Sequence, residues 1–167
     1  MPMKKLLTLT TLLASAALAS AATTVTLEGV HNCCKGCTNG IVKAAEGLKD
    51  VEVTAEGKTV TITAKSKANA KKAVEAIMAA GYFGTGAEEG SSSAAKADKT
   101  LKEATVTGAH LCCQKCVNAM SEAVKSVPGV TEAEIVSKQS TFTVKGEFSE
   151  QALVAAMNKA GFHGSVK

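Results

Sequence analysis

The hydrophobic and polar positions of this 167-residue chain alternate between two periods. Over residues 24–30 the side chains of Val25 and Leu27 share one face, which predicts a half-buried strand. Over residues 35–48 the apolar positions recur every three or four residues, which predicts an amphipathic helix. The apolar face of this helix consists of Ile41, Val42, Ala45 and Leu48.

Two further strands and a second helix follow. Residues 51–53 and 60–62 alternate between apolar and polar side chains, and Gly57 lies between them in a segment typical of a hairpin turn. Ser66 is a typical helix N-cap, and Gly81 ends the helical pattern that follows it. The inward positions of this second helix are Ala70, Ala73, Val74 and Ile77.

The same succession of elements occurs a second time. A short last strand near residues 82–86 completes the order β-α-β-β-α-β in the first copy. The expected elements of the second copy are strands over 104–109, 131–136 and 141–144, a helix striped by Val117, Met120, Val124 and Val127, and a helix capped by Ser149 with Leu153, Val154 and Met157 inward. This order is the ferredoxin-like arrangement, in which two helices cover one face of a four-stranded antiparallel sheet.

The repeat therefore predicts an α+β chain built from two ferredoxin-like modules, over residues 22–86 and 103–167. Residues 87–102 between the modules are small and polar and show no apolar period, so we expect them to form a flexible linker. Each module is near the lower size limit for a domain with its own hydrophobic core.

Residues 1–21 have the layout of a secretory signal peptide. Two lysines form a basic start, an uncharged apolar run reaches Leu18, and Ala19-Ser20-Ala21 forms a small-residue cleavage site. The alternative is an N-terminal membrane anchor, for which the apolar run is short. We expect the mature chain to begin near Ala22 and to work in the periplasm or outside the cell.

The composition argues against a nucleic-acid partner. The chain has no arginine, its aromatic residues make up 3% of the sequence, and 19 lysines face 15 acidic residues. Nucleic-acid sites depend on arginine forks and stacking aromatic rings, so neither kind of contact is available in quantity. We also expect no membrane contact once the signal peptide is removed.

The candidate chemistry is concentrated in two short clusters that hold all six cysteines. The first reads His31-Asn32-Cys33-Cys34-Lys35-Gly36-Cys37, and the second reads His110-Leu111-Cys112-Cys113-Gln114-Lys115-Cys116. Each cluster lies between the first strand and the first helix of its module, with the last cysteine in the first helical turn. The free N–H groups and the dipole of a helix start favour thiolate over thiol, and thiolates bind soft metal ions or attack disulfides.

Structural disulfides are the usual interpretation of an even number of cysteines in a secreted chain. Here a bridge within either cluster would close only a very small loop, which removes little entropy from the unfolded chain. Disulfides, if they form, are therefore not expected to be the main support of the fold.

The order of elements, with C-x-x-C in the first strand-to-helix loop, resembles the heavy-metal-associated domain family. This family includes copper chaperones, periplasmic mercury-binding proteins and N-terminal modules of metal-pumping ATPases. The second copy is the closer match, through Cys113-Gln114-Lys115-Cys116-Val117-Asn118-Ala119-Met120 and then Val127-Pro128-Gly129-Val130. Ala80-Gly81-Tyr82 and Ala160-Gly161-Phe162 resemble the family's loop beside the metal site. The resemblance implies metal ligation by Cys34, Cys37, Cys113 and Cys116.

Both copies depart from the family pattern in the same way, because a cysteine and a histidine occupy the run before the first ligand. We hypothesise that Cys33 and Cys112 are extra ligands; the alternative is that they are spare thiols, since adjacent side chains of an extended segment diverge. His31 and His110 are further candidates, and the alternative is that each is a polar residue at a strand end.

His163 has no counterpart in the first copy and is interpreted as a surface residue. Met78, Met120 and Met157 are interpreted as core residues.

The sequence thus predicts a metal-binding protein, not an enzyme, that captures, carries or sequesters a soft ion through its C-C-x-x-C thiolates. Cu(I) is the leading ion, with Zn(II) and Hg(II) as alternatives, and up to one ion per module is expected. A flexible linker would also let the two loops share one ion. The partner would be a metal-transporting ATPase or another metal acceptor protein.

The alternative function is a thiol-disulfide oxidoreductase or redox-sensing protein that uses the C-x-x-C pairs. The order of elements and the prolines argue against a thioredoxin fold. The mature chain contains Pro128 alone, so the first module has no candidate for the cis-proline of such folds.

Overall fold

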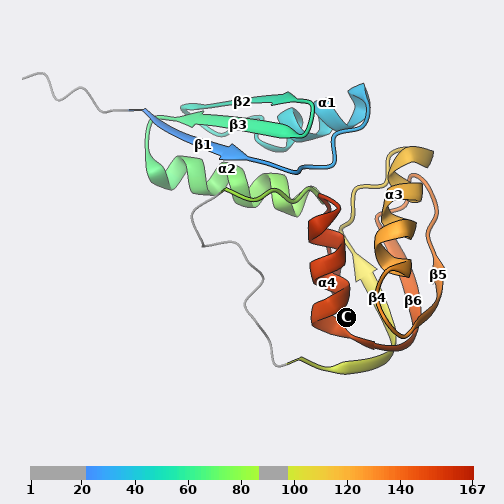
Figure 1. Cartoon of the computed structure of the whole chain (residues 1–167). Helices are drawn as coiled ribbons and strands as arrows, with labels where there is room; N and C mark the ends of the chain where they lie inside the picture. The colour runs from blue at the N-terminus through green and yellow to red at the C-terminus, as the bar shows by residue number, and fades with distance from the viewer. Residues whose placement is uncertain (1–21, 87–97) are drawn as a thin grey trace, which may run out of the picture.

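The computed structural model describes residues 22–86 and 98–167, which form a mixed α+β structure of four helices and two antiparallel sheets (Figure 1). The predicted α+β class is therefore confirmed. The expected signal peptide over 1–21 lies outside the described residues, as does most of the expected linker over 87–102. No helix within the described part of the chain is long and apolar enough to span a bilayer.

The first sheet and its helices belong to the N-terminal half. The elements are β1 (Thr23–Leu27), α1 (Lys35–Ala44), β2 (Val51–Glu56), β3 (Thr59–Ala64) and α2 (Lys67–Ala79), and the strand order is β1-β3-β2. The central strand β3 buries Val60, Ile62 and Ala64, whereas the threonines between them face away from the core. Both helices pack on the apolar side, as the period of two predicts.

The second sheet belongs to the C-terminal half. Its elements are β4 (Thr100–Thr107), α3 (Gln114–Lys125), β5 (Val130–Glu134), β6 (Thr141–Ser149), α4 (Glu150–Lys159) and β7 (Ser165–Val166), and the strand order is β5-β6-β4-β7. The two predicted serine caps are confirmed. The hydroxyl of Ser66 accepts a hydrogen bond from the amide of Asn69 at 3.2 Å, and that of Ser149 accepts one from the amide of Ala152 at 3.0 Å.

The prediction of four strands in the first sheet is wrong. Residues 82–86 form no strand; two isolated bridges replace it, one between Glu28 and Thr85 and one between Tyr82 and Phe162. Gly81 and Gly86 both have positive φ, which interrupts an extended strand at each end of the segment. In addition, Tyr82 pairs with the C-terminal half and not with its own sheet.

Several element boundaries differ from the sequence-based expectation, and the largest differences are in α1, β6 and β4. Helix α1 ends at Ala44 and not at Leu48, because Gly47 with φ +90° begins a turn toward β2. Strand β6 continues to Ser149. Strand β4 begins at Thr100, inside the expected linker, since the carbonyl of Lys99 accepts a hydrogen bond from the amide of Glu150.

The two halves meet through their loops, and two glycines permit the close approach. The carbonyl of Gly161 accepts hydrogen bonds from the amides of His31 (3.2 Å) and Phe83 (3.0 Å), and the carbonyl of Gly81 accepts one from His163 (3.0 Å). A Cβ atom at Gly81 would collide with the backbone of residues 108–110, and one at Gly161 would collide with that of residues 29–31. The contact is thus reciprocal, and it brings the loop before α1 against the C-terminal half (Figure 1).

Candidate metal centre

The cysteine loops lie where the sequence predicts them, at the starts of α1 and α3. Cys34 and Cys113 are the N-cap residues and have extended backbones. The carbonyl of Cys34 accepts a hydrogen bond from the amide of Cys37 at 2.9 Å, so Cys37 lies in the first turn of its helix. Cys116 occupies the same place in α3. Each C-x-x-C pair is therefore held by a helix N-terminus.

Within each half, one buried cysteine lies close to two others. The Sγ of Cys37 lies 3.8 Å from that of Cys33 and 3.6 Å from that of Cys34. The Sγ of Cys116 lies 3.7 Å from that of Cys112 and 3.8 Å from that of Cys113. Cys33 and Cys112 thus lie beside the predicted ligand pairs and do not turn away from them.

The two cysteine clusters also touch each other. Five sulfur–sulfur contacts cross between the halves: Cys33–Cys113 at 3.9 Å, Cys33–Cys116 at 3.7 Å, Cys34–Cys112 at 3.8 Å, Cys37–Cys112 at 3.6 Å and Cys37–Cys116 at 3.8 Å. No disulfide joins the six cysteines, all of which lie in the described part of the chain. They form a single group of free thiols, which we call the six-sulfur cluster.

Burial and hydrogen bonding shift the pKa values of several of these thiols, in opposite directions. A backbone hydrogen bond from Cys116 lowers the pKa of Cys113 to about 6. Burial acts to raise the pKa of Cys37, but hydrogen bonds from the backbone at Cys33 and from neighbouring thiols outweigh burial and lower it. Ionised thiols of this kind are ready ligands for a soft metal.

The pKa values of three other thiols are raised and not lowered. Burial raises the pKa of Cys33 to about 12, and burial also raises the pKa values of Cys112 and Cys116. A thiolate at Cys37 adds to the increase at Cys116, because two negative charges this close repel each other. The cluster can therefore become fully ionised only when cations enter it.

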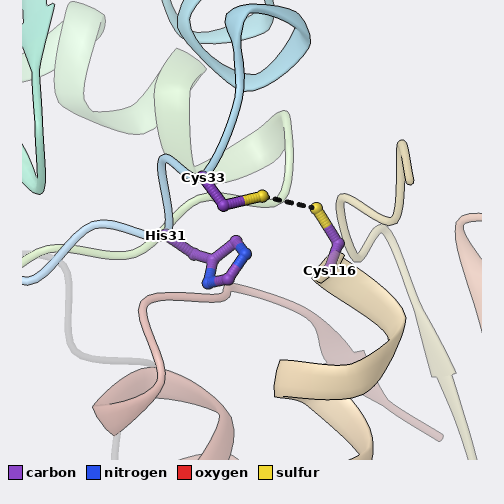
Figure 2. Close-up of side chains that lie close together, drawn as sticks. All are labelled: His31, Cys33 and Cys116. Carbon is purple, nitrogen blue, oxygen red and sulfur yellow. Dashed lines mark hydrogen bonds between the residues drawn. The ribbon is translucent and has the colours of Figure 1, made fainter. Parts of the chain in front are cut away.

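Both predicted histidines lie at the cluster, and each faces sulfurs from both halves. The ring of His31 groups with Cys33 and Cys116, as Figure 2 shows, and a ligand nitrogen and both sulfurs lie within 4.8 Å of one another. The ring of His110 groups in the same way with Cys37 and Cys112. Each histidine thus joins the cysteine two residues after it to the buried cysteine of the other half.

The surroundings of the two histidine rings favour the neutral form, which could bind a metal ion. The Nε2 atoms of His31 and His110 are buried and have no hydrogen-bond partner among the described residues. Burial is the largest cause that lowers the pKa of each ring, and neutral imidazole is the form that binds metal. The backbone of Ala160 forms a hydrogen bond with His31, which is typical of the second nitrogen of a metal-bound histidine.

Two aromatic residues support the site in a way that sequence reasoning missed. His31 stacks on Phe162 with ring centroids 4.2 Å apart, and His110 stacks on Tyr82 with centroids 4.4 Å apart. The repeated Ala-Gly-aromatic triplet pointed to the loop near the site. It did not reveal that each ring contacts the histidine of the other half.

The hydroxyl of Tyr82 also donates a hydrogen bond to the carbonyl of Cys37 at 3.1 Å. It lies against Gly40 in α1, where a Cβ atom would collide with it. A glycine inside a helix is unfavourable in itself, so Gly40 was a usable sequence signal for a close contact at this point.

The other candidate ligands of the sequence stay outside the cluster. Met78, Met120 and Met157 are buried in the hydrophobic core, which confirms their predicted packing role. His163 is half-buried at the contact between the halves and not a surface residue as expected. None of the possible metal-ligand groups found among the described residues includes it.

One protein family and two solved structures are similar to parts or all of this chain. Residues 105–163 match the heavy-metal-associated domain family. The structure is also similar to the N-terminal soluble domains of Bacillus subtilis CopA, with 18% sequence identity, a TM-score of 0.34 and coverage of 89% of this chain and 95% of that one. A second structure, of the water-soluble region of the P-type ATPase CopA from the same organism, gives the same identity and TM-score over 93% of its length. Residues 105–163 of this chain are therefore similar to a heavy-metal-associated domain.

Proposed function

We propose that this protein captures Cu(I) in the six-sulfur cluster and carries or sequesters it, without acting as an enzyme. The observation that carries the proposal is the set of five contacts of 3.6–3.9 Å between sulfurs of different halves. Thiols without a partner ion have no strong attraction for each other, whereas a soft cation binds several thiolates at once.

The spacing of the sulfurs favours an ion with three thiolate ligands. Metal–thiolate bonds are about 2.3 Å long for zinc, and an ion at the centre of a triangle with edges near 3.8 Å would lie about 2.2 Å from each sulfur. Such triangles exist, for example Cys33-Cys37-Cys116. In no set of four sulfurs is every pair in contact. A tetrahedron of four thiolates for Zn(II) is therefore not preformed.

His31 and His110 are proposed as additional ligands. Their unpartnered Nε2 atoms are the polar atoms that a metal would satisfy, since a buried donor or acceptor without a partner is costly. Three thiolates and one imidazole are also a zinc donor set, which makes Zn(II) the main competitor of Cu(I). Hg(II) is a further soft competitor.

A groove of about 430 Å³ gives access to one edge of the cluster. Its lining includes His31 and Cys33, and its charged residues are Lys58, Lys159 and Glu122, so basic side chains outnumber acidic ones. We propose that an acceptor protein, such as a metal-transporting ATPase, receives the ion here by stepwise exchange of thiolate ligands. The lysines would favour an acidic docking surface on this partner.

The tandem arrangement and the location complete the proposal. The recurring order of elements and the reciprocal contacts at Gly81 and Gly161 support two related modules, of which the second matches the family. The layout of residues 1–21 supports export to the periplasm or outside the cell.

A redox function is the second candidate. Free thiols 3.6–3.9 Å apart need only small shifts to form disulfides, and a thiol with a pKa of about 6 at Cys113 is a good nucleophile. The experiment below separates this function from metal binding.

The test is anaerobic native mass spectrometry of the reduced mature chain during separate titrations with Cu(I) and Zn(II). We expect retained Cu(I) that zinc does not displace, and we expect the C34S/C113S variant to retain less copper. A reduced chain that binds neither ion but cycles between thiol and disulfide would overturn the proposal and favour the redox function.

A further inference from the structure

We propose that the six-sulfur cluster binds four Cu(I) ions together, as one thiolate-bridged polynuclear centre shared by the two halves. The inference rests on the proposed function and goes beyond one ion per C-x-x-C pair. Its basis is the way in which the six sulfurs are connected.

The sulfurs group into four triads that use every cysteine twice. The triads are Cys33-Cys34-Cys37, Cys34-Cys112-Cys113, Cys33-Cys113-Cys116 and Cys37-Cys112-Cys116. Two of them are closed by contacts of 3.6–3.9 Å, and in the other two all sulfurs lie within 4.8 Å of one another. An ion in each triad would have three thiolate ligands, and each thiolate would bridge two ions.

This connectivity is that of an octahedron of sulfurs with ions on alternate faces. The three pairs of opposite corners are Cys33 and Cys112, Cys34 and Cys116, and Cys37 and Cys113, and none of these pairs is among the sulfur contacts of the described chain. Three of the four triads take sulfurs from both halves. The centre therefore cannot be assembled from two independent sites.

Charge favours several univalent ions over one. Six thiolates bring six negative charges into a region where Cys37 and Cys116 are fully buried. One Cu(I) would balance a single charge, whereas four leave a net charge of −2 on the centre. Loading involves no redox step: the Cu(I) ions bind thiolate sulfurs, and the thiol protons pass to solvent.

Cys33 and Cys112 gain a clear role under this inference. A single ion at each C-x-x-C pair needs neither residue. In the four-ion centre each belongs to two triads, and at least one of the two contains sulfurs from both halves, so both are bridging ligands.

The experiment uses the full mature chain, reduced and kept anaerobic, with Cu(I) supplied from a competing chelator as the probe. Native mass spectrometry counts the ions per monomer at each step. X-ray absorption on the saturated protein tests for copper atoms as neighbours of copper. We expect a step from the metal-free monomer to a four-copper monomer with little of the forms between, together with a copper–copper scattering path.

The C116S variant removes a sulfur from two triads, so we expect it to hold at most two ions and to lose the one-step loading. The copper–copper path of the wild-type protein is an independent test that does not require C116S to fold. The matched control is T38S, which keeps the hydroxyl beside Cys37 that donates to Asn32 and removes no sulfur. We expect it to load four ions.

The outcomes separate the two proposals. A saturated monomer without copper–copper scattering, or one that fills two sites independently, overturns the polynuclear centre and leaves Cu(I) capture standing. A reduced, folded chain that binds no Cu(I) overturns both. Copper clusters found only in a dimer overturn the intramolecular centre.

Discussion

The imidazole of His31 stacks on the ring of Phe162, with centroids 4.2 Å apart and planes inclined by 24°. The reciprocal pair, His110 on Tyr82, has a separation of 4.4 Å and an inclination of 29°. Each ring pair joins the histidine that precedes the cysteines of one half to an aromatic residue of the other half. The aromatic residues thus fix the position of one cysteine loop relative to the other.

Replacing His31 by phenylalanine tests ligation separately from packing. H31F keeps an aromatic ring against Phe162 but removes the unpartnered Nε2 atom. We expect Cu(I) affinity to fall by about tenfold or more. Losses of this size are typical when a residue that supports a metal ligand is removed, and His31 is proposed as a ligand itself. The free energy of unfolding of the metal-free chain should change by less than about 1 kcal/mol, because the lost bond to Ala160 is offset by removal of a buried unsatisfied atom.

The control for this variant is H163F, at a half-buried histidine of the same contact that lies outside the possible ligand groups. Competition with a Cu(I) chelator measures both affinities. Equal affinities for H31F and the wild type would show that His31 only packs.

Removing the Tyr82 hydroxyl should weaken the fold without changing the metal stoichiometry. In Y82F the carbonyl of Cys37 loses its hydrogen bond of 3.1 Å, while stacking on His110 is kept. We expect a loss of about 1 kcal/mol in the free energy of unfolding. Chemical denaturation of the metal-free variant measures it, and an unchanged midpoint would contradict the prediction.

A methyl group at Gly161 should separate the halves. The Cβ atom of G161A would collide with the backbone of residues 29–31, and the position has φ +85°. G47A is a matched control, because Gly47 has φ +90° and open space around it. Both variants should lose about 1–2 kcal/mol from the backbone conformation.

Only G161A should also lose Cu(I) affinity, since only it disturbs the contact that brings the two cysteine clusters together. Chelator competition on both variants measures this effect. Equal affinities in G161A and G47A would mean that metal binding does not need the contact.

Cys113 should be the thiol that is alkylated first in the metal-free protein. Its pKa is lowered to about 6, so the thiolate fraction falls as the pH falls through this value, whereas Cys33, with a pKa of about 12, stays protonated. Between pH 7 and pH 5 the alkylation rate of Cys113 should fall by about tenfold. Peptide mapping after brief iodoacetamide treatment measures the rate at each cysteine.

Cu(I) loading supplies the internal control for this experiment, because a bound thiolate is protected. Preferential alkylation of Cys33 at pH 7, or persistent alkylation of Cys113 after loading, would contradict the assigned roles.

The local structure of this protein follows from its sequence. The period of two in β3 and the serine caps of α2 and α4 were predictable, because each depends on neighbours within a few residues. The same holds for Cys37 and Cys116, whose place in the first helical turn follows from the pattern around them. The sequence therefore determined which residues are chemically competent.

Only the tertiary structure decided where those residues lie relative to one another. No period relates Cys33 to Cys116 or His31 to Phe162, since these pairs meet through loops from different halves. The same contact draws Tyr82 away from its own sheet, so that the first sheet has three strands and not the four expected. The reason is steric: glycines at positions 81 and 161 let two backbones approach where any side chain would keep them apart.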